Sequence, residues 1–170
     1  MSLSKGFYAR DVKEVARDLL GCFLCTKNSQ GRVIRSIITE TEAYDGEADL
    51  ACHASKGMTE RTSVMYEKGG VWYVYLCYGV HWMLNVVTGP KGYPAAVLIR
   101  GTEHFSGPGR LTKGLGVCGD LNRTQIEQSS ALWIEYKICQ PSRILSGPRI
   151  GVDYAGPEWS QKPYRFWFSN

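Results

Sequence analysis

The stretch YVYLCYGVHWMLNVV, residues 73–87, decides the fold that this sequence predicts. Two apolar, aromatic runs flank the dipeptide Tyr78-Gly79, and a glycine at such a position is typical of the turn of a β-hairpin. A hairpin turn is usually exposed, and glycine, asparagine or aspartate adopts its backbone conformation most easily. The sequence therefore predicts a hairpin with a large aromatic residue, Tyr78, at its tip.

Further elements are predicted on both sides of this hairpin. An apolar stripe predicts a helix over residues 11–20, with Asp11 and Glu14 as a capping box and Gly21 as its end. The predicted strands are residues 22–27, 32–44, 71–78, 81–87, 95–101, 149–152 and 164–169, and two more helices are predicted at residues 110–116 and 124–136. Because strands dominate and most are joined as hairpins, we expect an α+β fold. It is a single domain over residues 1–170, with a curved, mainly antiparallel β-sheet flanked by helices and a protruding hairpin.

Length and composition fit one soluble domain. The chain has 170 residues, of which 44% are hydrophobic, enough for one core. It has no apolar run long enough for a transmembrane helix, and its N-terminus has no apolar signal region. We therefore expect a cytoplasmic protein that does not enter a membrane.

The six cysteines do not predict a disulfide framework, because the chain shows no secretory signal. Cys22 and Cys25 form a C-x-x-C motif without a second pair at zinc-finger spacing. Cys52-His53 could supply further ligands, but small hydrophobic strand residues are the simpler interpretation. The other cysteines are Cys77, Cys118 and Cys139. The formal charge of +4, with ten tyrosines and five tryptophans, is compatible with binding to nucleic acid.

Two carboxylates stand close together at the end of a predicted strand, in TETEAYDG. Strand alternation places Glu40 and Glu42 on the same face. One interpretation is a solvated sheet edge, and this segment alone favours it. The other is that one glutamate is a general base that activates water, with Arg100 paired to a carboxylate to keep it ionised.

Other motifs are absent or ambiguous. His53, His81 and His104 do not have metal-ligand spacing, and the sequence has no phosphate-binding loop, dinucleotide fingerprint or serine-nucleophile motif. We expect no metal and no cofactor. Asn85 lies inside an apolar strand, where a buried amide needs hydrogen-bond partners; it serves either a backbone kink or a polar ligand.

Six separated blocks resemble one family in their order and spacing. The blocks are ETEAYDG, CHAS, VMYEKGGVWYVYLCYGVHWMLNVV, AVLIRG, GPGRLTKGLGV and RIGVDYAG, and they span the chain from Phe7 to Phe168. Together they resemble the alkyladenine DNA glycosylases, the mammalian-type 3-methyladenine DNA glycosylases also found in bacteria. The resemblance implies a DNA repair enzyme of base excision repair.

The resemblance also implies how a damaged base is bound. Tyr78 matches the tyrosine that inserts into duplex DNA where the damaged nucleotide leaves the stack. The flipped purine would lie between Tyr44 and Tyr75, and His53 would close the pocket, with its backbone N–H reading the base edge. Asn85 matches the asparagine that discriminates against guanine.

The implied chemistry is hydrolysis of the N-glycosidic bond. Glu42 would deprotonate a water held by Arg100 and the backbone carbonyl of Val152, and its carboxylate would stabilise an oxocarbenium ion. A base such as 3-methyladenine or 7-methylguanine already carries positive charge and needs no strong general acid, so Glu40 remains structural. The family uses water rather than an amine, which implies an enzyme without a lyase step.

Four residues are expected to contact DNA outside the pocket; for each of the three basic ones the alternative is a solvated surface charge. Met65 matches a residue that contacts DNA opposite the lesion, and basic residues are expected to bind phosphates without reading sequence. The basic residues are Arg61, Arg110 and Lys113. The chain departs from the family at Glu60, which replaces a usual proline, and at Gly114, which replaces a helix alanine at about 1 kcal/mol of local helix stability.

The expected partner is double-stranded DNA containing alkylated purines, with hypoxanthine and ethenoadenine as further candidate lesions, and we expect a monomer. Two other functions remain open. One is a module that binds damaged DNA without catalysis, against which Glu42 and Arg100 argue. The other is a small-molecule hydrolase on the same fold, which would not require Tyr78 at a hairpin tip.

Overall fold

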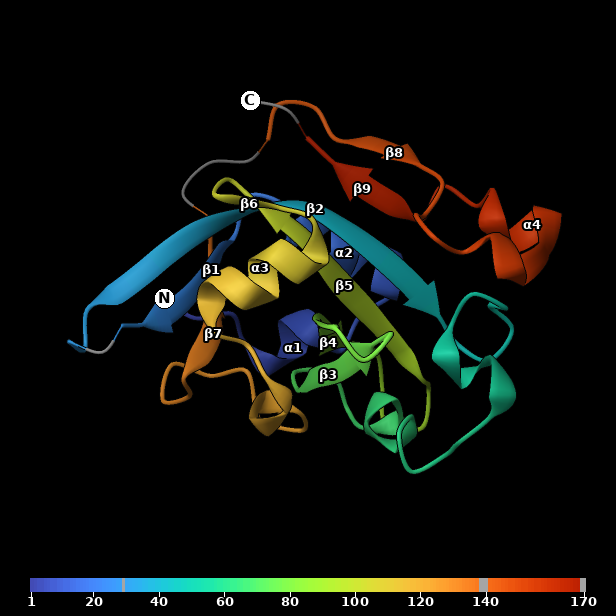
Figure 1. The fold of residues 1–170 in the computed structure, drawn as a ribbon, viewed down its shortest axis with the longest axis horizontal. Helices are drawn as coiled ribbons and strands as arrows, with labels where there is room; N and C mark the ends of the chain where they lie inside the picture. Colours follow the sequence, from blue (N-terminus) through green and yellow to red (C-terminus); the bar gives the residue numbers. More distant parts are fainter. Residues whose placement is uncertain (29, 138–140, 169–170) are drawn as a thin grey trace.

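The computed structural model describes residues 1–28, 30–137 and 141–168. In this part of the chain nine strands form one antiparallel sheet, with the main order β3-β4-β5-β2-β1-β7 (Figure 1). The strands are β1 (Phe23–Lys27), β2 (Val33–Asp45), β3 (Trp72–Cys77), β4 (His81–Val87), β5 (Ala95–Thr102), β6 (Phe105–Ser106), β7 (Leu132–Glu135), β8 (Leu145–Gly147) and β9 (Arg165–Trp167). The predicted α+β class and the antiparallel sheet are confirmed.

The stretch at residues 73–87 forms the hairpin of β3 and β4. Its strands pair from Trp72 with Val86 to Cys77 with His81, and residues 78–80 form the turn. On the other side, β4 pairs with β5, so this hairpin is the edge of the main sheet order. The apolar alternation of the two strands buries one side against the core and leaves the turn outside it.

The long strand β2 connects the two halves of the sheet. Its first half pairs with β1, and its second half pairs with β5 on one side and β9 on the other. The pairing with β5 shifts register between Ile38 and Thr41, which indicates a β-bulge. Because a bulge bends a strand and redirects its side chains, it sets the direction of the residues that follow, beginning with Glu42.

Helices cover both sides of the sheet. Figure 1 shows α1 (Lys5–Tyr8) and α2 (Val12–Asp18) behind the sheet and α3 (Pro108–Leu115) in front of it, with α4 (Gly156–Ser160) at its far end. The Asp11 side chain caps α2 by accepting from the N–H groups of Lys13 and Glu14, at 2.9 and 3.3 Å. The apolar stripes of α2 and α3 belong to the main core. In α3, a Cβ at Gly114 would collide with the Phe105 ring, which explains the glycine at that position.

Two predicted elements are wrong. Residues 124–136 were expected to form a helix, but this segment contains an irregular stretch followed by β7. The helix-favouring residues are overridden because Leu132–Glu135 pairs with β1 and its side chains are buried in the sheet. Residues 149–152 were expected to form a strand but connect β8 to the short helix η4 (Asp153–Ala155). The remaining strands lie within one or two residues of their predicted bounds.

The irregular segment predicted at residues 45–70 contains two short 3₁₀ helices, η1 (His53–Lys56) and η2 (Ser63–Tyr66), and a third, η3, spans Gly119–Leu121. The five described cysteines are unpaired, and Cys139 lies outside the described residues. Among the residues that the structure describes, no helix is long and apolar enough to cross a membrane, and no acidic, histidine and cysteine side chains gather into a group that could hold a metal ion.

Candidate active site

A cavity of about 260 Å³ opens beside the β3–β4 hairpin, close to the lower end of the range of small-molecule pockets. Its lining comes from β2, the irregular segment at 45–70, β3, β4, β5 and the segment before η4. Of the residues that the sequence predicted for the site, the cavity brings together Tyr44, His53, Met65, Tyr75, Tyr78, Asn85, Arg100 and Val152. Segments far apart in the chain therefore meet at one hollow.

Aromatic side chains form the walls of the cavity. Tyr44 reaches it from β2 and Tyr75 from β3, and both are half-buried. The ring centroid of His53 lies 4.7 Å from that of Tyr75, in an edge-to-face arrangement, and its Nδ1 lies 2.9 Å from the Tyr73 hydroxyl. Burial, with a smaller contribution from the positive charges of Arg61 and Lys56, lowers the pKa of His53 to about 4. The imidazole is therefore neutral at pH 7.

Two polar groups at the wall keep hydrogen-bonding capacity. Asn85 is buried, lines the cavity and donates from Nδ2 to the backbone carbonyl of Tyr73 at 3.1 Å. Its amide is therefore held by the neighbouring strand, and its oxygen keeps acceptor capacity. His53 is the first residue of η1, where a helical N–H has no carbonyl acceptor within the helix.

The Glu42 carboxylate is fully buried directly behind the cavity wall. Its Oε1 accepts from the Ile150 N–H at 2.7 Å, and its Oε2 accepts from the Tyr44 hydroxyl at 2.8 Å. Burial raises the pKa of Glu42, while Arg100, the Ile150 N–H and the Tyr44 hydroxyl act in the opposite direction. Such an environment is typical of a carboxyl group used in catalysis. Glu42 itself does not line the cavity, but three of its neighbours do.

Arg100 and Val152 also belong to the wall of this cavity. The Nη1 of Arg100 lies 3.5 Å from Oε1 of Glu42, and Arg100 lines the cavity. Val152 also lines it, and its carbonyl accepts one hydrogen bond, from the Ala155 N–H at 3.0 Å. A carbonyl oxygen has a second lone pair, so Val152 can also hold a water.

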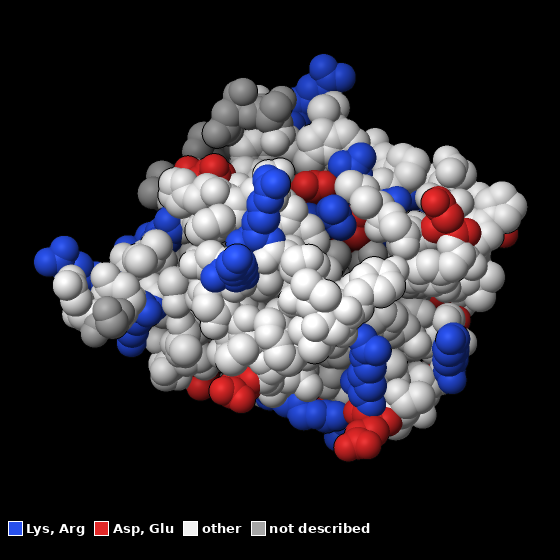
Figure 2. Space-filling view, viewed as in Figure 1, with Lys and Arg blue, Asp and Glu red and all other residues white. Residues whose placement is uncertain are grey.

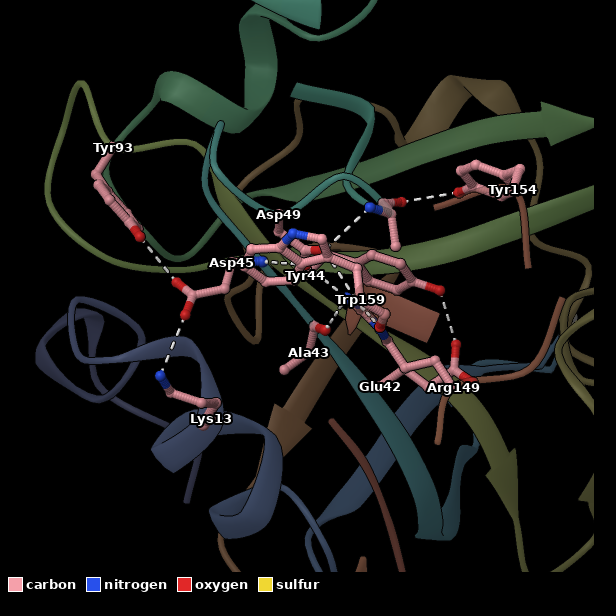
Figure 3. A network of polar contacts seen from close by, with 11 residues as sticks. Lys13, Glu42, Ala43, Tyr44, Asp45, Asp49, Tyr93, Arg149, Tyr154 and Trp159 are labelled. Atoms are coloured by element: carbon pink, nitrogen blue, oxygen red, sulfur yellow. Dashed lines mark hydrogen bonds and ion pairs between the residues drawn. The ribbon is translucent and has the colours of Figure 1, made fainter. Parts of the chain in front are cut away.

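A buried ion pair supports Tyr44 from behind, and sequence reasoning missed it (Figure 3). Arg149 and Asp49 are both fully buried, and the Arg149 guanidinium binds both carboxylate oxygens and the carbonyl of Ala43. The Arg149 guanidinium lies 4.8 Å from the Tyr44 ring centroid and 5.2 Å from that of Tyr164. It therefore makes cation–π contacts with both aromatic rings. A charged residue among the apolar residues RIGV was the available signal.

Tyr78 occupies the hairpin turn at an unfavourable backbone angle. Its φ is 51° and that of Gly79 is 67°, both in the left-handed region. A residue with a Cβ is uncommon there, and the cost is about 1–2 kcal/mol. The Tyr78 side chain is 95% exposed and also lines the cavity mouth. No packing among the residues that the structure describes therefore explains the tyrosine at this position.

The four predicted DNA contacts outside the pocket differ in their placement. Met65 is 2% exposed and lines the cavity, so the structure does not give it the surface position that a contact opposite the lesion requires. Arg110 and Lys113 are exposed on α3, and Figure 2 shows basic side chains on the face where α3 lies. The Arg61 guanidinium stacks on the Tyr75 ring, 4.8 Å from its centroid.

The chain is similar to known proteins along most of its length. The sequence model of the family described as Methylpurine-DNA glycosylase (MPG) matches residues 6–107 and 102–170. A protein of Myxococcus xanthus named "Putative 3-methyladenine DNA glycosylase" is 46% identical over 175 residues, which cover 97% of this chain and 89% of the relative. Proteins with the same name from Methanocella arvoryzae and Psychrobacter cryohalolentis are 44% and 43% identical, over 99% and 90% of this chain and 92% and 86% of the relatives.

Proposed function

Because this chain belongs to the methylpurine-DNA glycosylase family, and so is a DNA glycosylase that hydrolyses the N-glycosidic bond, we propose that it removes alkylated purines from duplex DNA with a water activated by Glu42. The proposed substrates are 3-methyladenine and 7-methylguanine, with neutral lesions such as hypoxanthine and ethenoadenine as further candidates. One observation carries the proposal. A buried carboxylate and an arginine converge behind an aromatic cavity whose mouth holds an exposed tyrosine.

In this mechanism the damaged nucleotide leaves the duplex and its base enters the cavity between Tyr44 and Tyr75. Tyr78 fills the space left in the stack, and this contact offsets part of the cost of unstacking, a few kcal/mol. The side chain of Asn85 and the N–H of His53 face the edge of the base. Guanine carries an exocyclic amine that would crowd Asn85, which gives the cavity a means to reject it.

Hydrolysis then takes place next to the Glu42 carboxylate. The guanidinium of Arg100 and the carbonyl of Val152 orient a water, Glu42 accepts its proton, and the oxygen bonds to C1′ as the C1′–N bond breaks. Developing positive charge on the sugar is stabilised by the carboxylate and the bond electrons leave with the base. A cationic alkylpurine leaves without further help, whereas a neutral purine depends more strongly on Glu42. All groups of this site belong to one chain, so we propose that the monomer is active.

The test is the change Glu42→Gln, which removes the base and keeps the shape. We expect single-turnover release of hypoxanthine from a duplex to fall by about 10²–10⁴-fold, the usual contribution of a general base. Affinity for the lesion-containing duplex should change little, because the stacking and phosphate contacts remain. Glu103→Gln is the matched control: the same chemical change at a partly exposed carboxylate that accepts from the Ile37 N–H and does not line the cavity.

Three outcomes separate the candidate functions. Loss of base release in Glu42→Gln alone supports the proposed mechanism. Full activity in Glu42→Gln contradicts water activation by this residue. If the parent protein binds methylated DNA but releases no purine from it, the chain is a damaged-DNA-binding module without catalysis.

A further inference from the structure

The side chain of Arg100 is shared between two glutamates. Its Nη1 lies 3.5 Å from Oε1 of Glu42, and its Nε donates to Oε1 of Glu40 at 3.3 Å. All three side chains are largely withdrawn from solvent, with exposed fractions of 12% for Arg100, 20% for Glu40 and 0% for Glu42. In the orientation that brings Arg100 close to Glu42, the proposed general base, its guanidinium is therefore also bonded to Glu40.

A second arginine binds Glu40 from the opposite side of the strand. Arg165, on β9, donates from Nη1 to Oε1 of Glu40 at 3.1 Å and from Nε to the carbonyl of Pro148 at 2.9 Å. Arg100 comes from β5, so arginines from both strands that flank β2 meet at one carboxylate oxygen. The result is a row of alternating charges: Arg165, Glu40, Arg100 and Glu42.

We propose that Glu40 is a positioning residue, which fixes the Arg100 guanidinium beside Glu42 and limits how strongly Arg100 stabilises the Glu42 carboxylate. This inference rests on the proposed function, because it takes Glu42 to be the group that activates water. It also replaces the expectation that Glu40 is only structural. Its carboxylate touches neither the cavity nor the reacting atoms and acts through Arg100.

The charges around Glu42 give this arrangement a measurable consequence. The charged and titratable groups that face Glu42 are Arg100 from β5, Tyr44 and Glu40 from β2, Arg149 from the segment after β8, and Arg165 from β9. Glu40 repels the charged form of Glu42 and also competes for Arg100, so it contributes to the raised pKa of Glu42. Glu42 acts when ionised, so the pH at which the rate rises follows this pKa.

The experiment is the pH dependence of single-turnover hypoxanthine release by the parent, Glu40→Gln and Arg165→Met, with enzyme in saturating excess. Without Glu40, the charge of Arg100 acts on Glu42 alone, so the acid limb should move to lower pH by about 1 unit. The rate on the plateau should fall about tenfold to hundredfold, because the Nε of Arg100 loses its anchor. In Arg165→Met, a positive charge near Glu42 is lost, and Glu40 interacts more strongly with Arg100 at the expense of Glu42. The pKa of Glu42 should therefore rise, and the acid limb should move to higher pH.

Two further variants distinguish positioning from general damage. Glu40→Asp keeps the charge but shortens the side chain, so its acid limb should stay near that of the parent while its plateau falls. Asp45→Asn removes a partly buried, ion-paired carboxylate from the same strand, bonded to Lys13 and Tyr93 and without contact to Arg100. Its acid limb should coincide with that of the parent.

Opposite shifts in Glu40→Gln and Arg165→Met support the inference. If the acid limbs of the pH–rate profiles do not move, or if both move in the same direction, the inference is wrong, even when the plateau rates fall. Glu40 and Arg165 lie on different strands. Each variant that folds therefore tests the predicted direction of its own pH shift independently of the other variant. If the parent protein itself releases no purine base, the proposed function is wrong. If the variants are active but their acid limbs do not move, only the inference about Glu40 is wrong.

Discussion

The replacement of Tyr78 by glycine should raise the stability of this protein while it lowers the activity. Tyr78 is held at a φ of 51°, and its side chain is 95% exposed. Truncation of the side chain therefore removes almost no buried apolar area. The backbone strain remains in Tyr78→Ala, because alanine also has a Cβ, but it disappears in Tyr78→Gly.

The expected gain follows from two opposing contributions. Relief of the left-handed conformation is worth about 1–2 kcal/mol, and the greater freedom of glycine in the unfolded chain costs about 0.5–1 kcal/mol. Tyr78→Gly should thus exceed Tyr78→Ala by about 0 to 1.5 kcal/mol in free energy of unfolding, with a central value of about 0.8 kcal/mol. For a chain of this size, 1 kcal/mol corresponds to an increase in Tm of about 2–4 °C. Tyr78→Asn should behave like the glycine variant, since asparagine tolerates this conformation.

The activity of the Tyr78 variants should depend on the loss of the aromatic side chain and not on the backbone conformation of the turn. Stacking of an aromatic residue on a base is worth about 1–3 kcal/mol, so all three variants should release hypoxanthine about tenfold to hundredfold more slowly at subsaturating enzyme. Urea unfolding and single-turnover release, measured on the same preparations, test both parts. A glycine variant less stable than the alanine variant would refute the strain at Tyr78. Parent-like release by all variants would refute its insertion into DNA.

Three further predictions concern the wall of the cavity and its support. Asn85→Ala should increase the release of guanine from undamaged DNA relative to lesion release; an unchanged ratio would reject Asn85 as the guanine filter. His53 has a pKa lowered from 6.5 to about 4 in the folded state, so the unfolded chain binds its proton first and stability falls as pH decreases from about 6.5 to about 4. His53→Gln should lose less stability over this range, as urea unfolding at several pH values would show. Asp49→Asn leaves Arg149 buried without its charge partner and should cost about 3–5 kcal/mol of unfolding free energy, whereas a loss below 1 kcal/mol would contradict the structural role of the pair.

The sequence correctly predicted the strands that have a clear pattern of apolar residues within their own segment. The strands around Tyr78 and the strand that carries Glu42 have strong alternation or apolar runs, and the structure contains them near the predicted bounds. The predicted helix at residues 124–136 is wrong because its last residues pair with β1, a strand more than 100 residues earlier in the chain. A single-sequence pattern does not contain the position of such a distant partner.

The same limit applies to the site. The resemblance brought together the residues of the cavity, yet it gave no information on Arg149, whose partner Asp49 lies 100 residues earlier in the chain. It also left Glu40 structural, because strand alternation places Glu40 beside Glu42 but does not show that both share Arg100. Met65 was assigned to a DNA surface by resemblance alone, and its burial became visible only in the folded chain.

Three unfavourable features of this molecule gather around one cavity, and their placement supports its proposed function. A tyrosine with left-handed backbone, a buried carboxyl group and a histidine kept neutral by burial each reduce the stability of the fold. Tyr78 and His53 line the cavity, and Glu42 lies directly behind it. Natural sequences keep such features where function requires them. Tyr78 shows this most directly: glycine would suit the turn better, the core gains nothing from the ring, and only a partner outside the chain can explain why the side chain is there.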